Sequence, residues 1–145
     1  MKKIKYFIPS ILLMILIFGF SNQTGNESSS LSGQIVQWLQ MNLHISIPEF
    51  IIRKGAHMSE YAVLTMTFIY GFYKSEFKQF QVYSFSLLAT FLYACTDELH
   101  QLFIGGRAGQ ITDVLIDTSG GILAIVLIYC ITYVYNKRKS AILSQ

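Results

Sequence analysis

The chain has 145 residues, of which 52% are hydrophobic and only 13% are charged, and its formal net charge is +3. Typical soluble domains contain about 25% charged residues, so the composition argues against a soluble domain and indicates a single membrane domain over residues 1–145. Without a basic stripe interleaved with aromatic residues, we expect no nucleic-acid partner. Cys95 and Cys130 lie in separate apolar runs without metal-ligand spacing, which favours two small buried apolar side chains.

The first apolar segment runs from about residue 4 to residue 20 and begins beside Lys2, Lys3 and Lys5. Its length approaches the roughly 20 apolar residues with which a helix crosses a bilayer. A cleaved signal peptide would show the same order of charge and apolar residues. The sequence Phe18-Gly19-Phe20, however, offers no small-x-small cleavage site. We therefore expect this segment to be retained as a membrane helix.

The connection over residues 21–45 is the longest one predicted outside the membrane. It starts with a stretch rich in serine, asparagine and glycine, SNQTGNESSS. After the serine run, Leu31, Ile35, Trp38 and Leu39 share one helical face. This pattern predicts a short amphipathic helix that lies at the membrane interface or caps the bundle.

A second helix is predicted from about residue 47 to residue 73, with its apolar part over 56–73. Ser46 would be the N-cap, Pro48 the proline of the first turn, and Glu49 the acid of a capping box. Because the start signals precede the apolar part, the first turns of this helix should lie outside the hydrocarbon region.

Two further apolar helices are predicted, and the short connection at Lys74-Ser75-Glu76 should make the second and third spans an antiparallel hairpin. The predicted fold is therefore all-α. It is a polytopic membrane protein, a four-transmembrane-helix bundle with a short amphipathic helix in its first outer loop. The four spans are predicted at about 4–20, 56–73, 80–99 and 111–135.

The distribution of basic residues predicts the orientation of this bundle. With the N-terminus in the cytoplasm, eight of the eleven basic residues lie on the cytoplasmic side, namely Lys2, Lys3, Lys5, Lys74, Lys78, Lys137, Arg138 and Lys139. Arg53, Lys54 and Arg107 then lie outside. We expect a multi-pass protein of the cell membrane with both termini cytoplasmic, and the three exceptions suggest a local task for these cations.

Polar residues are concentrated in two clusters beside the apolar runs, and both clusters fall on the predicted outer side. An Asp, Lys or Arg at a bilayer centre costs roughly 2.5–3.5 kcal/mol, so such residues usually mark a functional site. The first cluster contains Arg53, Lys54, His57 and Glu60. The second contains Asp97, Glu98, His100, Gln101, Arg107, Asp113 and Asp117.

Helical spacing relates the members of the first cluster to one another. Arg53, His57, Glu60 and Tyr61 fall on one stripe, and Lys54 lies about 100° away from it. The alternative to a functional site is a self-neutralising cap, in which His57 pairs with Glu60 and Arg53 reaches lipid phosphates.

The second cluster spans the end of one helix, a loop and the start of the next. Asp97 and Gln101 share a helical face from which Glu98 is rotated away, whereas Asp113 and Asp117 face the same way. Asp117 lies more than a turn inside its span and needs a partner, for which Arg107 is the obvious candidate.

Small residues punctuate the same region. Gly105, Gly106 and Gly109 give the loop the freedom to fold back over the bundle. The run Thr118-Ser119-Gly120-Gly121 predicts close packing of the fourth span against a neighbouring helix.

Three chemistries are compatible with these clusters. In the first, Arg53, Lys54 and Arg107 bind the anionic group of a polar ligand at the outer membrane surface while carboxylates hold the cations in place. In the second, the pairs His57-x-x-Glu60 and Asp97-x-x-His100 contribute to a metal site. In the third, a histidine acts as the base of a hydrolase or transferase. No GxSxG or HExxH motif is present, and cofactors and catalysis stay open.

Two stretches resemble the VanZ-like family of small bacterial membrane proteins, whose namesake is associated with resistance to the glycopeptide teicoplanin. They are RKGAHMSEYAVL at 53–64 and TDELHQLFIGGRAGQITDVLIDTSGG at 96–121. The resemblance implies a polytopic membrane protein, in many relatives a four-helix one. The positions that match those typical of the family are Arg53, Lys54, His57, Glu60, Tyr61, Asp97, Glu98, Gln101, Arg107, Asp113, Asp117 and Gly120, and His100 is also common in relatives.

From the clusters and the resemblance we expect an extracytoplasmic site that binds a cell-envelope lipid or a lipid-linked precursor. Binding there would lower susceptibility to glycopeptide or lipoglycopeptide antibiotics. The alternatives are a metal-dependent envelope-lipid hydrolase or transferase, and a structural partner of another membrane protein.

Overall fold

The computed structural model describes residues 3–143, which are all-α as predicted. Lys2, one of the basic residues in the orientation count, lies outside this range. A 3₁₀ turn, η1 (Ile4–Phe7), leads into the first of five α-helices. These are α1 (Ile8–Ser21), α2 (Gly25–Leu43), α3 (Glu49–Lys74), α4 (Gln79–Gln101) and α5 (Ile111–Leu143).

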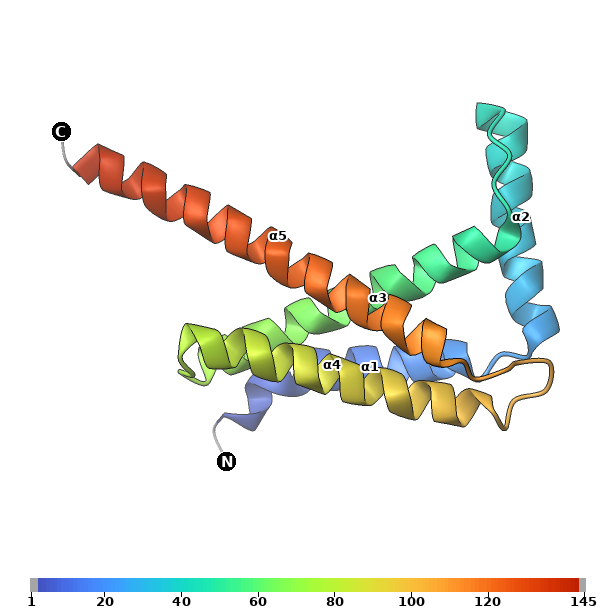
Figure 1. Ribbon diagram of the computed structural model, residues 1–145, viewed down its shortest axis with the longest axis horizontal. Coiled ribbons are helices and arrows are strands. Elements are labelled where there is room, and N and C mark those ends of the chain that lie inside the picture. Colours follow the sequence, from blue (N-terminus) through green and yellow to red (C-terminus); the bar gives the residue numbers. More distant parts are fainter. Residues whose placement is uncertain (1–2, 144–145) are drawn as a thin grey trace.

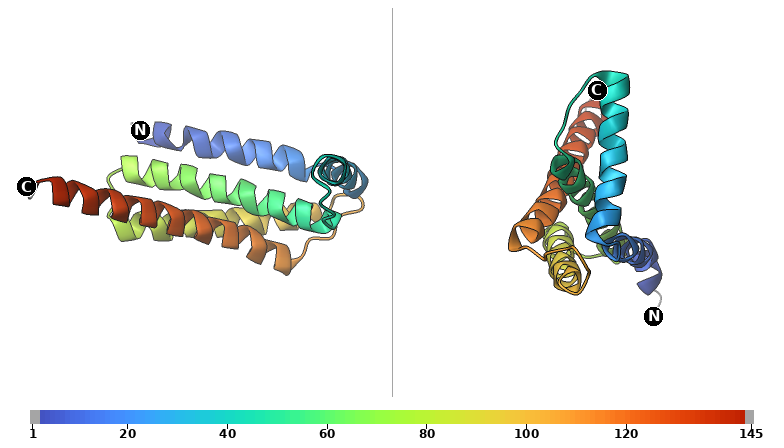
Figure 2. Two further views of the ribbon diagram at one scale, coloured as in Figure 1. Left: turned by 90° about the horizontal axis from the view of Figure 1, so that it is seen from above. Right: turned by 90° about the vertical axis from the view of Figure 1, so that its right-hand side faces the viewer.

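Four helices lie alongside one another and α2 runs steeply across one end of them (Figure 1). Helix α3 is central, because it contacts α1, α2, α4 and α5. The short connection between α3 and α4 makes these two helices an antiparallel hairpin, as the sequence predicts. Both termini lie at the end of the molecule away from α2 (Figure 2).

Helix α2 begins earlier than the sequence pattern indicates. Its N-cap is Thr24, whose side chain accepts a hydrogen bond from Glu27 N at 3.3 Å, while Glu27 Oε2 accepts one from Thr24 N at 2.8 Å. This capping box also lowers the pKa of the Glu27 carboxyl, because the backbone hydrogen bond from Thr24 favours its charged form. The expectation that serines start a short helix is therefore wrong, since those serines lie within a helix of 19 residues.

The capping box gives a first testable prediction. Thr24→Ala removes the side-chain acceptor and should destabilise the start of α2 by about 1 kcal/mol. Amide hydrogen exchange of residues 25–28 should then become several-fold faster. Ser30→Ala is the matched control because Ser30 is exposed within the same helix. Equal exchange in the two variants would show that the cap does not hold this helix end.

The other boundaries differ from prediction at two places. Ser46 does not cap α3, which begins at Glu49 with Pro48 at the N-cap position and without a side-chain cap. The residue before a proline is driven toward extended conformations, so Ile47 cannot begin the helix. Helix α5 continues past residue 135 to Leu143, because no glycine or proline follows to end it.

Two helices are long and apolar enough to cross a membrane, over Ile4–Ser21 and Ile111–Leu143. In the most apolar 18-residue stretch of each helix, only 17% and 28% respectively is buried, whereas the core helix of a soluble protein is mostly buried. This exposure is consistent with a membrane protein. Helices α3 and α4 do not reach the same apolarity, so four spans are not established by this criterion.

The interior contains many polar side chains. Ser10, Thr65, Ser86 and Thr90 are buried, and the hydroxyls of Thr65 and Thr90 lie 2.8 Å apart between α3 and α4. They accompany an apolar core of Ile17, Tyr61, Leu64, Phe68, Ala94 and Val114. Cys130 is exposed and Cys95 only half-buried, so the expectation of two buried cysteines is wrong.

The small-residue run of α5 packs closely against α3, as predicted. A Cβ atom at Gly120 would collide with the carbonyl oxygen of Met58, and one at Gly121 would lie 2.7 Å from Thr65 Oγ1. This close approach fixes α5 against α3 next to the polar residues at the end of the bundle that α2 crosses.

Candidate ligand-binding site

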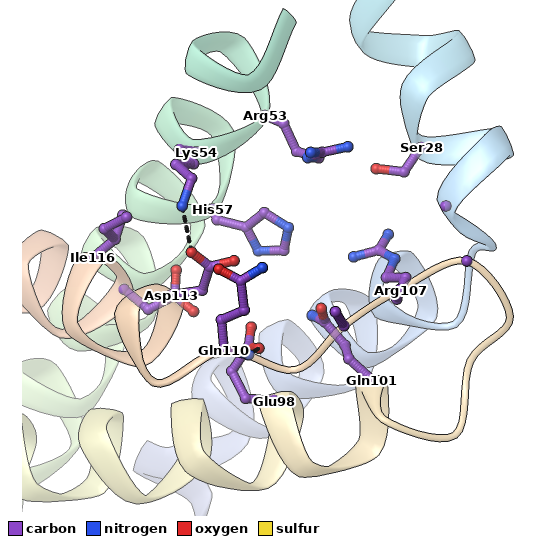
Figure 3. A pocket seen from close by; sticks show the side chains of 14 residues that line it. Ser28, Arg53, Lys54, His57, Glu98, Gln101, Arg107, Gln110, Asp113 and Ile116 are labelled. Atoms are coloured by element: carbon purple, nitrogen blue, oxygen red, sulfur yellow. Dashed lines mark hydrogen bonds and ion pairs between the residues drawn. The ribbon is translucent and has the colours of Figure 1, made fainter.

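A cavity of about 220 Å³ lies where α2, α3, α4 and α5 meet the loop over residues 102–110 (Figure 3). Eight of the eleven predicted site residues line this polar cavity. They are Arg53, Lys54, His57, Glu98, Gln101, Arg107, Asp113 and Asp117. The fold thus brings the two sequence clusters together at one end of the bundle.

The two cations of α3 differ in how they are held. Lys54 Nζ lies 2.5 Å from Asp113 Oδ1, an ion pair that joins α3 to α5. Arg53 makes only long contacts, 3.4 Å to Ser29 Oγ and 3.9 Å to Glu49 Oε1. Its guanidinium lies on the side of α3 that faces α2 and the cavity (Figure 3). Arg53 is therefore the more available cation.

Arg107 does not pair with Asp117, so that expectation is wrong. Its Nε donates to Gln23 O at 2.9 Å and its Nη2 donates to Phe20 O at 3.3 Å. Carbonyls at the C-terminus of a helix carry partial negative charge, which attracts the guanidinium to Phe20 at the end of α1 and to Gln23 in the turn that follows it. Burial lowers the pKa of Arg107, and the charge of Asp97 opposes that shift.

The glycine-rich loop folds back over the bundle, as predicted. Gly105 O accepts a hydrogen bond from Gly25 N at 3.1 Å, and Gly106 adopts a φ of 75° where it passes the start of α2. A side chain at Gly25 would collide with the backbone of Gly106. The loop therefore forms one wall of the cavity.

Glu98 is buried together with Asp97, although helical spacing places them on different faces. Its Oε2 accepts a hydrogen bond from Gln110 N at 2.9 Å, which ties the loop to α4. Glu98 therefore belongs to the site although it lies on a different face from Asp97, because the returning loop covers that face of α4.

Three predicted site residues lie outside the polar cavity. Asp97 lies behind its wall, where Gln101 Nε2 donates to Asp97 Oδ2 at 3.2 Å and to Ser21 Oγ at 3.0 Å. Glu60 lines a second cavity that adjoins the first. His100 Nε2 lies 2.9 Å from Asn22 Oδ1, and its ring packs on Phe18, so His100 faces α1.

Several buried polar atoms in this region have no hydrogen-bond partner among the described residues. They are both carboxylate oxygens of Asp117, Asp97 Oδ1, His57 Nδ1 and the Tyr61 hydroxyl. Asp117 is only 1% exposed. An unpaired buried polar group is costly, so the atoms of Asp117 and His57, which also line the cavity, are natural partners for a ligand or for water.

A second, mostly apolar cavity of about 170 Å³ adjoins the first between α1, α2 and α3. The two share Ser28, Arg53, His57 and Arg107 as lining residues. Away from these residues, the second cavity, hereafter the apolar groove, is lined by Phe20, Leu31, Ile35, Ile52 and Ala56, among others. One molecule with a polar and an apolar part would fit both spaces.

Sequence reasoning did not find Gly25, Ser28 and Gln110 as part of the site. Gly25 and Ser28 line the cavity only because α2 begins at Gly25, and the Thr24-x-x-Glu27 capping box is the signal that marks this start. Gln110 joins through its backbone N–H, which donates to Glu98 and which no side-chain pattern reveals.

Two features of the catalytic alternatives are not formed by the described residues. Among residues 3–143, no group of three or more His, Cys, Asp and Glu side chains is arranged to hold a metal ion. His57 Nδ1 lies 4.0 Å from Glu60 Oε2, which is too long for the hydrogen bond that would orient a general base.

Comparison with known proteins identifies one family. The model of the VanZ/LLP1 family matches residues 6–133, a range that includes every residue lining the polar cavity. No curated protein and no solved structure matches the chain.

Proposed function

The chain belongs to the VanZ/LLP1 family, and from this we propose that it is a four-pass membrane protein that binds a lipid head group through its phosphate. The head group would belong to a membrane lipid or a lipid-linked cell-envelope precursor and would occupy the polar cavity. The observation that carries the proposal is that Arg53 and Arg107 line both this cavity and the apolar groove beside it.

The membrane placement rests on which side chains face outward. Helix α4 buries Ser86 and Thr90 and exposes Leu88, Phe91 and Leu92, the reverse of a helix in a soluble protein. We therefore include α3 and α4 among the spans, with their polar residues turned toward neighbouring helices. With four spans both termini lie on one side, and the basic residues place that side in the cytoplasm.

Helix α2 would then lie along the outer surface of the membrane. It runs steeply across the end of the bundle, and Leu31, Ile35 and Trp38 are exposed on it. A helix with an exposed apolar face in this orientation suits the boundary between head groups and acyl chains. The cavity beneath α2 would therefore open at the depth of lipid head groups.

The two arginines provide the attraction for an anion. Arg53 and Arg107 are both positively charged and line the same cavity, so their guanidiniums repel each other. An anionic group between them would relieve this repulsion and accept charge-assisted hydrogen bonds. Arg53, whose present contacts are long, has donors to offer.

The size and surroundings of the cavity favour a lipid over a free anion. Pockets for drug-sized ligands usually measure about 300–1,000 Å³, so 220 Å³ suits a head group and not an entire lipid. The adjoining apolar groove, which contains Leu31 and Ile35, offers a path for the start of an acyl or prenyl chain.

We extend the proposal to antibiotic susceptibility in bacterial cells. Occupation of the site would change the envelope lipid that a glycopeptide such as teicoplanin, or a lipoglycopeptide, encounters. Cells that produce the Arg53→Gln protein at the wild-type level should then lose the decrease in susceptibility that the wild-type protein provides. Equal susceptibility with the two proteins would remove this extension.

Lipid binding can be tested with the purified full chain in detergent. Arg53→Gln keeps the length of the side chain but removes its charge, and affinity for phosphatidylglycerol should fall about tenfold, as expected for one charge-assisted hydrogen bond. Native mass spectrometry would measure the bound fraction, with diacylglycerol as a probe that lacks the phosphate.

Lys137→Gln is the matched control, because Lys137 is an exposed cation on the part of α5 that lies beyond the cavity. It should retain wild-type binding. If Arg53→Gln and Lys137→Gln bind phosphatidylglycerol equally well, or if diacylglycerol binds as strongly, the cavity is not the anion site.

A further inference from the structure

The polar cavity has opposite charges at its mouth and its floor. The mouth is formed by Arg53, Lys54 and Asp113, whose side chains are 38%, 35% and 31% exposed. The floor is formed by Asp117 and Glu98, which are 1% and 6% exposed. Lys54 already pairs with Asp113, whereas Arg53 makes only long contacts, so Arg53 is the available cation at the mouth. At the floor, Asp117 is a carboxylate without a hydrogen-bond partner among the described residues.

Asp117 is the residue that most needs a partner. Both of its oxygens lack a hydrogen bond within the described residues, and it lines the cavity. The groups whose charges act on it most strongly are all carboxylates, namely Glu98, Asp97, Asp113 and Glu60. A purely anionic ligand would add negative charge to this surplus, whereas a ligand that carries its own cation would offset it.

The form of that cation follows from the geometry. A metal ion would need several ligands around one point, and no such group occurs among residues 3–143. An ammonium group needs only acceptor oxygens that lack other donors, and Asp117 offers two of them. Glu98, which also lines the cavity, has one further acceptor oxygen, because its Oε2 already accepts a hydrogen bond from Gln110 N.

We propose that the cavity selects a zwitterionic lipid head group, with its phosphate between Arg53 and Arg107 and its ammonium against Asp117. This inference rests on the proposed function and specifies its ligand class. The phosphate would occupy the part of the cavity that adjoins the apolar groove, and the ammonium would lie deeper, between α4 and α5.

The test compares two lipids that differ only beyond the phosphate. Phosphatidylethanolamine and phosphatidylglycerol with identical acyl chains are offered together to the full chain in detergent micelles. The wild-type protein should bind the ethanolamine lipid about tenfold more tightly, the effect of one charge-assisted contact. Asp117→Asn, which keeps the shape of the side chain, should bring this ratio close to one by weakening binding of the ethanolamine lipid.

Glu76→Gln is the matched control, because Glu76 is an exposed acid at the opposite end of the bundle. It should keep the wild-type ratio. A wild-type ratio near one would overturn the inference even if Asp117→Asn did not fold, and so would an unchanged ratio in folded Asp117→Asn. If Arg53→Gln weakens both lipids while the ratio stays near one, the proposed function stands and only the zwitterion is wrong.

Discussion

Replacing Gly120 with alanine should force α5 away from α3 and cause a large loss of stability. The new Cβ would collide with the carbonyl oxygen of Met58, which is backbone and cannot rotate away. Overpacking of this kind costs about 3 kcal/mol. At this chain length, that loss corresponds to roughly 10 °C in melting temperature.

Thermal unfolding of the detergent-solubilised chain would measure this effect. Gly55→Ala is the matched control, because a Cβ there meets no atom within 4 Å and Gly55 lies on the partner helix α3. Alanine at that position should be neutral or stabilising by up to about 1 kcal/mol. Equal melting temperatures for the two variants would show that α3 and α5 are not packed as closely as the structure places them.

The sequence predicted most of the helices because their signals are local. Apolar length and the short turn near Ser75 were sufficient for the α3–α4 hairpin, and small residues were sufficient for the contact at Gly120. The start of α2 was missed because its residues are polar and lack the apolar periodicity of a buried face. The cap formed by Thr24 and Glu27 is the local signal that overrides this composition.

The candidate site was predicted in composition but only partly in its pairings. Helical spacing can place Asp113 and Asp117 on one face, and both line the cavity. It cannot say which cation of another element reaches them, because that depends on how the helices are rotated. Thus Lys54 pairs with Asp113, while Arg107 is drawn to the end of α1, whose carbonyls could not be located from spacing.

Arg107→Lys should weaken ligand binding and loosen the loop over residues 102–110, even though it keeps the positive charge. The planar guanidinium donates from two nitrogens to Gln23 O and Phe20 O. Lysine carries a single ammonium on a shorter, flexible side chain and cannot reproduce that pair of contacts. The loop over residues 102–110 would lose a tie to α1. Amide exchange in this loop should then increase about tenfold, and affinity for phosphatidylglycerol should fall by a similar factor.

The control is Arg138→Lys, the same substitution at an exposed position near the end of α5, which should leave both measurements unchanged. The paired readouts separate two roles of Arg107. If exchange rises but affinity does not, Arg107 only holds the loop and the anion depends on Arg53 alone. If neither changes, positive charge is sufficient at this position, and the contacts with the end of α1 do not position the loop that forms the cavity wall.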